Sequence, residues 1–89
     1  MQWRVIEYRE FYDVPRMIVA TNDEGAFLFY SRFDEHLDSY LTHYEVFRLP
    51  NTLINDLPRS WVDLEQRAIG RIADVPVNEL PFAVERRIS

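Results

Sequence analysis

The chain has 89 residues, of which 47% are hydrophobic and 28% are charged, and its formal net charge at pH 7 is −5. It contains no cysteine, no lysine and only two glycines. This composition excludes thiolate and Schiff-base chemistry and the glycine-rich loops that bind phosphates or dinucleotides. The acidic balance disfavours nucleic acid and favours a basic protein partner.

The length fits a single domain over residues 1–89. The N-terminus has no uninterrupted apolar stretch that could act as a signal peptide, and no window is long and apolar enough to span a bilayer. The missing cysteines agree with a reducing compartment. We therefore expect a cytoplasmic protein without membrane contact.

The first predicted elements are strands. Residues 3–8 form one strand, followed by a break over residues 9–14. Residues 16–21 and 26–31 are β-branched and aromatic runs that flank a four-residue turn with Asn22 first and Gly25 last. This pattern is typical of a β-hairpin.

Both faces of this hairpin are apolar. Met17 and Val19 point to one side of the first strand, and Ile18 and Ala20 point to the other. A strand pair with one face in water would alternate apolar with polar residues. The second face must therefore be covered by a helix, by closure of a barrel or by a partner chain.

Residues 33–43 follow the hairpin, and their apolar side chains fit helical spacing over only about three turns. We interpret this segment as a loop with one helical turn. A further strand is predicted over residues 44–49, where Pro50 ends it.

A short helix is predicted over residues 61–69. Ser60 and Asp63 resemble a capping box, and Gly70 suits the position that ends a helix. The apolar stripe on this helix would cover the second face of the hairpin; it consists of Trp61, Leu64 and Ala68.

A last strand is expected over residues 71–77, and Pro76 indicates that it lies at a sheet edge. The predicted fold class is α+β and mostly β. It is a small antiparallel sheet, or a partly open SH3-like barrel, of about five strands with one short helix before the last strand.

One polar cluster could carry chemistry. His36, Asp38 and His43 are residue types that bind zinc and other divalent metals, and Ser39 between them allows a hydrolytic triad. However, the two histidines would lie about 10 Å apart along a helix. The pattern therefore favours a solvated acidic loop without a metal or cofactor.

Two other features of the sequence are candidate sites. Glu65 falls inside the apolar arc of the predicted helix, where it is either a general acid or base, or a structural carboxylate paired with an arginine. The connection before the hairpin carries Phe11, Tyr12 and Arg16, which are residue types common at interface hot spots.

Two functional hypotheses follow. The first is a non-catalytic cytoplasmic protein–protein interaction module that acts by self-association or as an acidic inhibitor or immunity-type protein. The alternative is a small metal-dependent or hydrolytic enzyme that uses His36, Asp38 and His43, with Glu65 in support.

Overall fold

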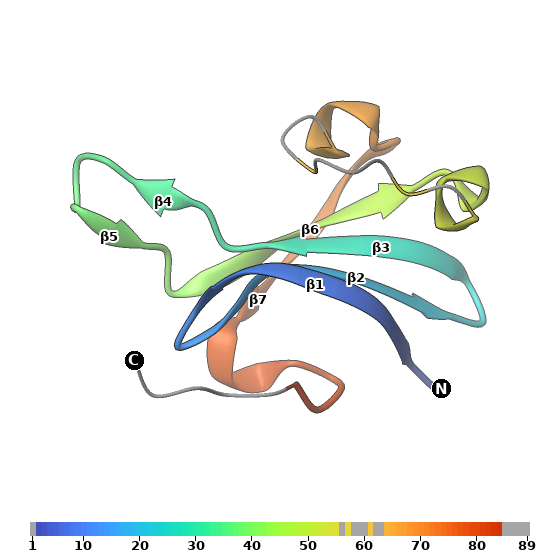
Figure 1. Ribbon diagram of the computed structural model, residues 1–89, viewed down its shortest axis with the longest axis horizontal. Coiled ribbons are helices and arrows are strands. Elements are labelled where there is room, and N and C mark those ends of the chain that lie inside the picture. Colours follow the sequence, from blue (N-terminus) through green and yellow to red (C-terminus); the bar gives the residue numbers. More distant parts are fainter. Residues whose placement is uncertain (1, 56, 58–60, 62–63, 85–89) are drawn as a thin grey trace.

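The computed structural model describes residues 2–55, 57, 61 and 64–84, with the backbone alone for Phe11 and Tyr12. Five antiparallel strands form one sheet in the order β1-β2-β3-β6-β7 (Figure 1). Their bounds are β1 Arg4–Tyr12, β2 Val14–Asn22, β3 Gly25–Tyr30, β6 His43–Leu49 and β7 Gly70–Pro76. The prediction of a mostly β fold with a five-stranded antiparallel sheet is confirmed.

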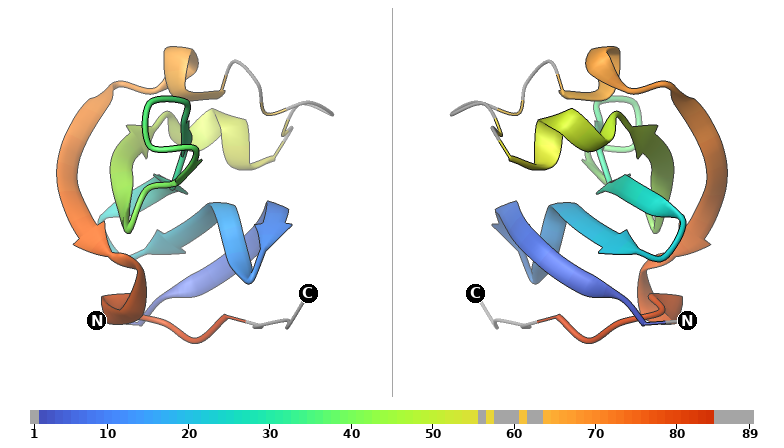
Figure 2. Two further views of the ribbon diagram at one scale, coloured as in Figure 1. Left: turned by 90° about the vertical axis from the view of Figure 1, so that its left-hand side faces the viewer. Right: turned by 90° about the vertical axis from the view of Figure 1, so that its right-hand side faces the viewer.

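The sheet curves but stays open. Its two edges are β1 and β7, and no pairing joins them within the described residues (Figure 2). Residues 77–84 instead cross one face of the sheet after β7, with the short 3-10 helix η3 (Val77–Glu79) at their start. Of the two predicted forms, a small antiparallel sheet or a partly open SH3-like barrel, the open sheet describes the fold, because the chain covers this face with a crossing segment rather than by closing the ladder.

The predicted hairpin is confirmed as β2 and β3, which pair from Met17 opposite Tyr30 to Asn22 opposite Gly25. The Asn22 side-chain oxygen accepts a hydrogen bond from the Glu24 backbone N–H at 2.7 Å. Gly25 has a φ of 144°, a backbone conformation that residues with a Cβ rarely adopt. The turn residues thus fix the strand register.

Each face of the sheet carries its own buried cluster, as the two-sided apolar pattern predicts. One cluster consists of Val14, Ile18, Ala20, Phe27, Phe29, Tyr44 and Val46. The other consists of Met17, Val19, Ala26, Leu28, Leu49, Trp61 and Leu64. Alternate residues of β2 and β3 belong to opposite clusters, so the middle of the sheet is buried on both sides.

The first face is covered by the two ends of the described chain. The Trp3 ring lies 5.5 Å from the Phe27 ring and 5.5 Å from the Phe82 ring, measured between centroids. Phe82 also meets Phe29 edge to face at 5.1 Å. Such tilted and edge-on contacts are the preferred arrangements of aromatic pairs. This cover is not among the features predicted from the sequence.

The second face is covered by the segment that contains Trp61 and Leu64, which are 3% and 0% exposed. The nine-residue helix predicted for this segment is wrong, because the helical structure among its described residues is a 3-10 turn, η2 (Leu64–Arg67). Ser60 and Asp63 of the predicted capping box lie outside the described residues. The Ile69 N–H donates to the Arg48 carbonyl at 2.7 Å, so the chain already joins the sheet where the helix was expected to continue.

One more difference concerns the first strand. β1 continues without the expected break as far as Tyr12, and Asp13, with a φ of 63°, makes the turn into β2. β7 lies at the sheet edge, as Pro76 predicts. Pro50 follows β6 and leads into the 3-10 helix η1 (Asn51–Ile54).

Candidate binding surface at the β4–β5 hairpin

A small hairpin projects from the sheet between β3 and β6 (Figure 1). It consists of β4 (Phe33–Asp34) and β5 (Ser39–Tyr40), joined by a turn over residues 35–38. Phe33 pairs with Tyr40, and Asp34 pairs with Ser39. The helical turn expected in residues 33–43 is therefore wrong, and the segment forms a two-stranded arm.

The tip of the arm is held by a side chain. Asp34 Oδ1 accepts hydrogen bonds from the backbone N–H groups of His36, at 2.8 Å, and Leu37, at 3.3 Å. Aspartate favours such turns because its short side chain can satisfy nearby backbone donors. Asp38 has a φ of 52°, a left-handed conformation that aspartate tolerates better than most residues.

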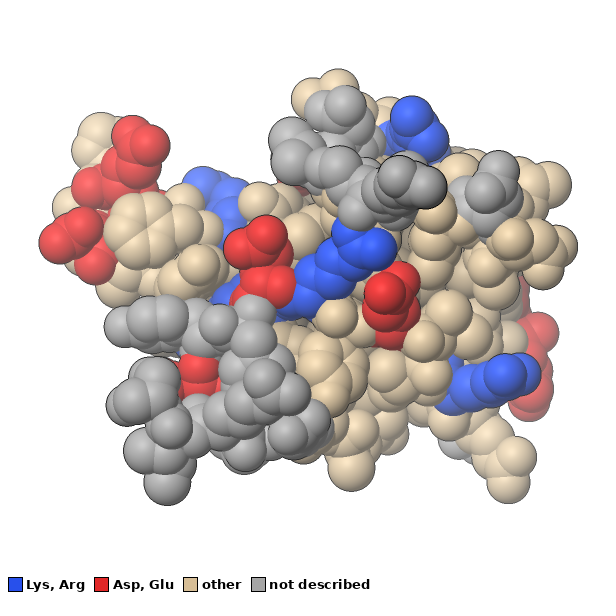
Figure 3. Space-filling view, viewed as in Figure 1, with Lys and Arg blue, Asp and Glu red and all other residues tan. Residues whose placement is uncertain are grey.

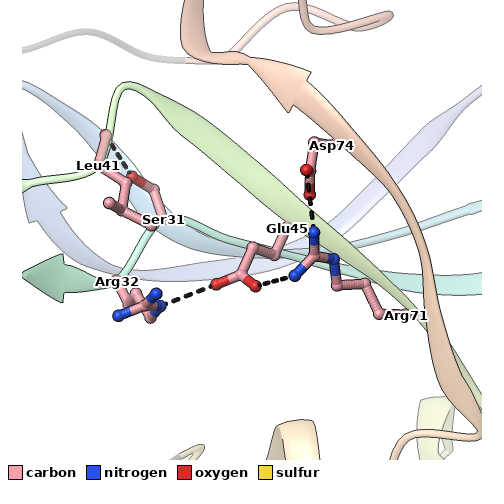
Figure 4. A network of polar contacts seen from close by, with 6 residues as sticks. All are labelled: Ser31, Arg32, Leu41, Glu45, Arg71 and Asp74. Carbon is pink, nitrogen blue, oxygen red and sulfur yellow. Dashed lines mark hydrogen bonds and ion pairs between the residues drawn. The ribbon is translucent and has the colours of Figure 1, made fainter.

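The base of the arm is anchored in the core. Ser31 is fully buried, and its hydroxyl donates to the Leu41 carbonyl at 2.9 Å (Figure 4). Arg16, which is 9% exposed, donates from Nη1 to the Ser31 hydroxyl at 3.1 Å. Its guanidinium carbon also lies 4.9 Å from the centroid of the Tyr40 ring. The arm thus starts from a fixed position.

Apolar side chains are exposed on this arm. Phe33 is 45% exposed and Leu37 is 66% exposed. The Phe33 ring meets the Tyr40 ring edge to face at 5.3 Å, so it has a defined orientation although it faces solvent. Exposed aromatic and aliphatic groups in fixed positions are typical of contact surfaces.

The arm is also acidic. It carries Asp34, Glu35 and Asp38 and has no arginine, and Figure 3 shows acidic side chains gathered at that end of the molecule. The Asp34 side chain holds the turn, whereas Glu35 and Asp38 are exposed and form no ion pair within the part of the chain that the structure describes.

A second polar network lies beside the arm and is structural. Glu45, on β6, accepts from Arg32 at 3.0 Å and from Arg71 at 2.8 Å (Figure 4). Arg71 also contacts Asp74 at 3.0 Å. These contacts tie β7 and the end of β3 to β6. They also engage Arg32, the arginine nearest to the arm in sequence, with a carboxylate on the sheet.

The histidine cluster does not form a compact site. His36 and Asp38 lie in the exposed turn of the arm, whereas His43 is half-buried at the start of β6. Among the described residues, no group of three or more histidines and carboxylates is close enough to hold a metal ion. Ser39 is exposed on β5.

Glu65 is half-buried in the first turn of η2. Its negative charge acts on Tyr30, at the end of β3. Burial, and then the charges of Glu65 and Glu10, raise the pKa of Tyr30 above its ordinary value of 10.0. Glu65 thus influences a neighbouring phenol at the margin of the second core cluster.

The three predicted interface residues have different positions. Arg16 is buried and donates a hydrogen bond to Ser31 at the base of the arm, so it does not lie on the surface. Phe11 and Tyr12 lie at the end of β1, and their side chains are outside the described residues. The exposed residues of the arm, Phe33 and Leu37, were not predicted as contacts. The signal for them was a turn-forming Asp34 between two aromatic residues, Phe33 and Tyr40.

A shallow hollow of about 350 Å³ lies at the opposite end of the molecule, between the β2–β3 turn and η1. Its lining is mostly polar and includes Asn22, Glu24 and Asn51, and no histidine or serine is among the described lining residues. The hollow therefore gives no support to the hydrolytic hypothesis.

In comparisons with protein-family models, curated proteins and solved structures, nothing matches this chain. No helix in the described part of the chain has the length and apolarity needed to cross a membrane. Function must therefore be inferred from the chain's own residues.

Proposed function

We propose that this chain is a non-catalytic, cytoplasmic protein–protein interaction module whose contact surface is the β4–β5 arm. One observation carries the proposal: Leu37 and Phe33 are exposed on a hairpin that is fixed at both its tip and its base. Neither side chain belongs to the two core clusters, so the fold of the sheet does not account for them.

The energetics of the arm suit this role. Burying a leucine or phenylalanine side chain completely is worth about 1.5 to 3 kcal/mol. Because the hydrogen bonds of Asp34 and Ser31 already order the arm, little conformational entropy remains to be lost on binding. Two such anchors therefore support a specific contact even on a small surface.

The sheet edges favour a different protein as the partner over a second copy. β1 carries a register shift between Val5 and Glu7, and the pairing of β6 with β7 shifts between Val46 and Phe47. Pro76 removes a backbone donor from β7. Bulges, prolines and charges on edge strands oppose the addition of further strands. This supports the inhibitor-like form of the hypothesis.

The proposal is tested with a photoreactive amino acid placed at position 37, and separately at position 72, in the chain expressed in its source cells. Ile72 is the matched control because it is also an apolar residue, 56% exposed, but lies on β7. We expect a defined protein to be cross-linked from position 37 and not from position 72.

The purified pair is then measured directly. Leu37→Ser should weaken binding about tenfold or more, as expected when an interface anchor is lost, whereas Ile72→Ser should leave the affinity unchanged. A partner that binds Leu37→Ser as tightly as wild type, or one cross-linked only from position 72, would contradict the proposed surface.

A further inference from the structure

The charges on the arm specify the partner more closely than its apolar groups do. Glu35 and Asp38 flank Leu37 in the turn of the arm and are exposed, with no ion pair to any described residue. By contrast, Glu45 beside the arm is only 12% exposed and contacts two arginines. The Glu45 carboxylate is thus used by the fold, whereas those of Glu35 and Asp38 form no ion pair within the described residues.

We infer, on the basis of the proposed function, that the arm inserts its tip into a partner cleft with an apolar floor and a rim of lysine or arginine side chains. Leu37 meets the floor, and Glu35 and Asp38 meet the rim. The partner is accordingly a basic protein surface.

The physical reason is the cost of desolvation. Leu37 cannot reach an apolar pocket without bringing the neighbouring carboxylates close to the partner, where an unpaired carboxylate loses hydration without compensation. Cations on the rim remove that cost and form charge-assisted hydrogen bonds. They also draw the arm toward the cleft, because the chain has a net charge of −5.

The chain offers a clean pair of variants for a test. Glu35→Gln with Asp38→Asn removes two charges and keeps the shape of the turn, because asparagine tolerates the left-handed φ of 52° at position 38. Asp34 is left intact because it holds the turn.

The matched control is Asp23→Asn with Glu24→Gln. It changes the net charge by the same amount in another exposed turn, between β2 and β3, at the opposite end of the molecule (Figure 1). Any effect of overall charge alone would appear equally in both double variants.

The probe is a phage library that displays domain-sized fragments of the source organism's proteome. It is selected on the wild-type chain, and clones that still bind Leu37→Ser are discarded. The remaining fragments are produced in soluble form, and their association rates and affinities are measured at low and at moderate salt.

We expect the fragments to carry a surplus of lysine and arginine and to bind less tightly as salt increases. The Glu35→Gln, Asp38→Asn variant should bind them about threefold to tenfold more weakly, mainly through a slower association rate, and the Asp23→Asn, Glu24→Gln control should bind like wild type.

Different results would contradict the basic rim of the partner and the interaction surface on the arm. Fragments that need Leu37 but bind the Glu35→Gln, Asp38→Asn variant as well as wild type would overturn the basic rim and leave the interaction surface standing. Equal losses in both double variants would also overturn it. If no fragment depends on Leu37, the proposed function itself fails, and the rim fails with it.

Discussion

Tyr44 makes a fully buried polar side-chain contact within the sheet. Its side chain is 0% exposed, and its hydroxyl donates to the Pro15 carbonyl at 2.6 Å. Its ring also meets Phe29 edge to face at 6.3 Å. A phenol that is buried this deeply needs its hydrogen bond, because the alternative is a desolvated polar group. Tyr44 therefore links β6 to the start of β2 through a hydrogen bond as well as through packing.

Replacing Tyr44 by phenylalanine tests this link. We expect the free energy of unfolding to fall by about 1 to 2 kcal/mol, because the variant keeps the ring but removes the donor to Pro15. Urea denaturation followed by circular dichroism measures the change. An unchanged denaturation midpoint would show that the hydroxyl contributes nothing to stability.

The raised pKa of Tyr30 makes stability depend on alkaline pH. Above pH 10.0 the phenol of the unfolded chain ionises before that of the folded chain, so the folded state holds more protons and stability falls as pH rises further. Below pH 10.0 both states are protonated and the effect vanishes.

Glu65→Gln should lower the pKa of Tyr30 and reduce the alkaline loss of stability, because it removes one of the charges that raise this pKa. The pKa should stay above 10.0, since burial is the largest cause. NMR titration of ring-labelled tyrosine measures it, with Glu35→Gln on the arm as the control. A Tyr30 pKa that does not move in Glu65→Gln would contradict the assignment.

Among the elements, the short turn η2 covers the second buried cluster of the sheet. Leu64 is 0% exposed and packs in the cluster that contains Met17, Val19 and Leu28. The guanidinium of Arg9, on β1, lies 4.9 Å from the Trp61 ring and closes the outer side of this cover. Four residues of 3-10 helix have little stability of their own, so packing holds them.

Leu64→Ala should therefore lower the free energy of unfolding by about 2 to 5 kcal/mol, as for large-to-small changes in other cores. Ile69→Ala is the matched control: Ile69 follows η2 closely but is 67% exposed, so its loss should be within about 0.5 kcal/mol. Chemical denaturation of both variants provides the comparison. Equal losses of unfolding free energy in the two variants would mean that η2 does not cover the sheet.

The elements that sequence reasoning predicted are those with long, regular patterns. β2 and β3 are uninterrupted β-branched and aromatic runs around Asn22 and Gly25, and this pattern fixes their pairing and their two faces. The cover by Trp61 and Leu64 was also predictable, since the second apolar face requires one. Its conformation was not, because nine residues with caps at both ends fit a helix and a 3-10 turn alike.

The arm escaped prediction for a related reason. Strands of two residues are too short to show alternation, and Phe33, Leu37 and Tyr40 happen to have helical spacing. What decides the structure is tertiary: Ser31 and Arg16 hold the base, and both contact Leu41. These contacts join residues 10 and 25 positions apart, which no local pattern reveals.

At the scale of the whole molecule, the open sheet leaves two edges that need protection. β1 has a bulge between Val5 and Glu7, and Glu10 adopts a φ of 58°, so its edge is irregular along much of its length. β7 has its own register shift, carries Arg71 and Asp74 and ends at Pro76. An edge with such features offers a poor template for strand addition. For this reason the proposed contact surface is the arm rather than a sheet edge.

We therefore expect the chain to be a monomer over a wide range of concentrations, which size-exclusion chromatography with light scattering measures directly. Pro76→Thr should stay monomeric as well, because the bulge in β7 and the charges of Arg71 and Asp74 remain. A dimer that persists in Leu37→Ser would show that the edges are not protected. A dimer that dissociates in Leu37→Ser would show that the arm binds a second copy of the chain. Arginines of that second copy would then have to form the basic rim around the acidic tip.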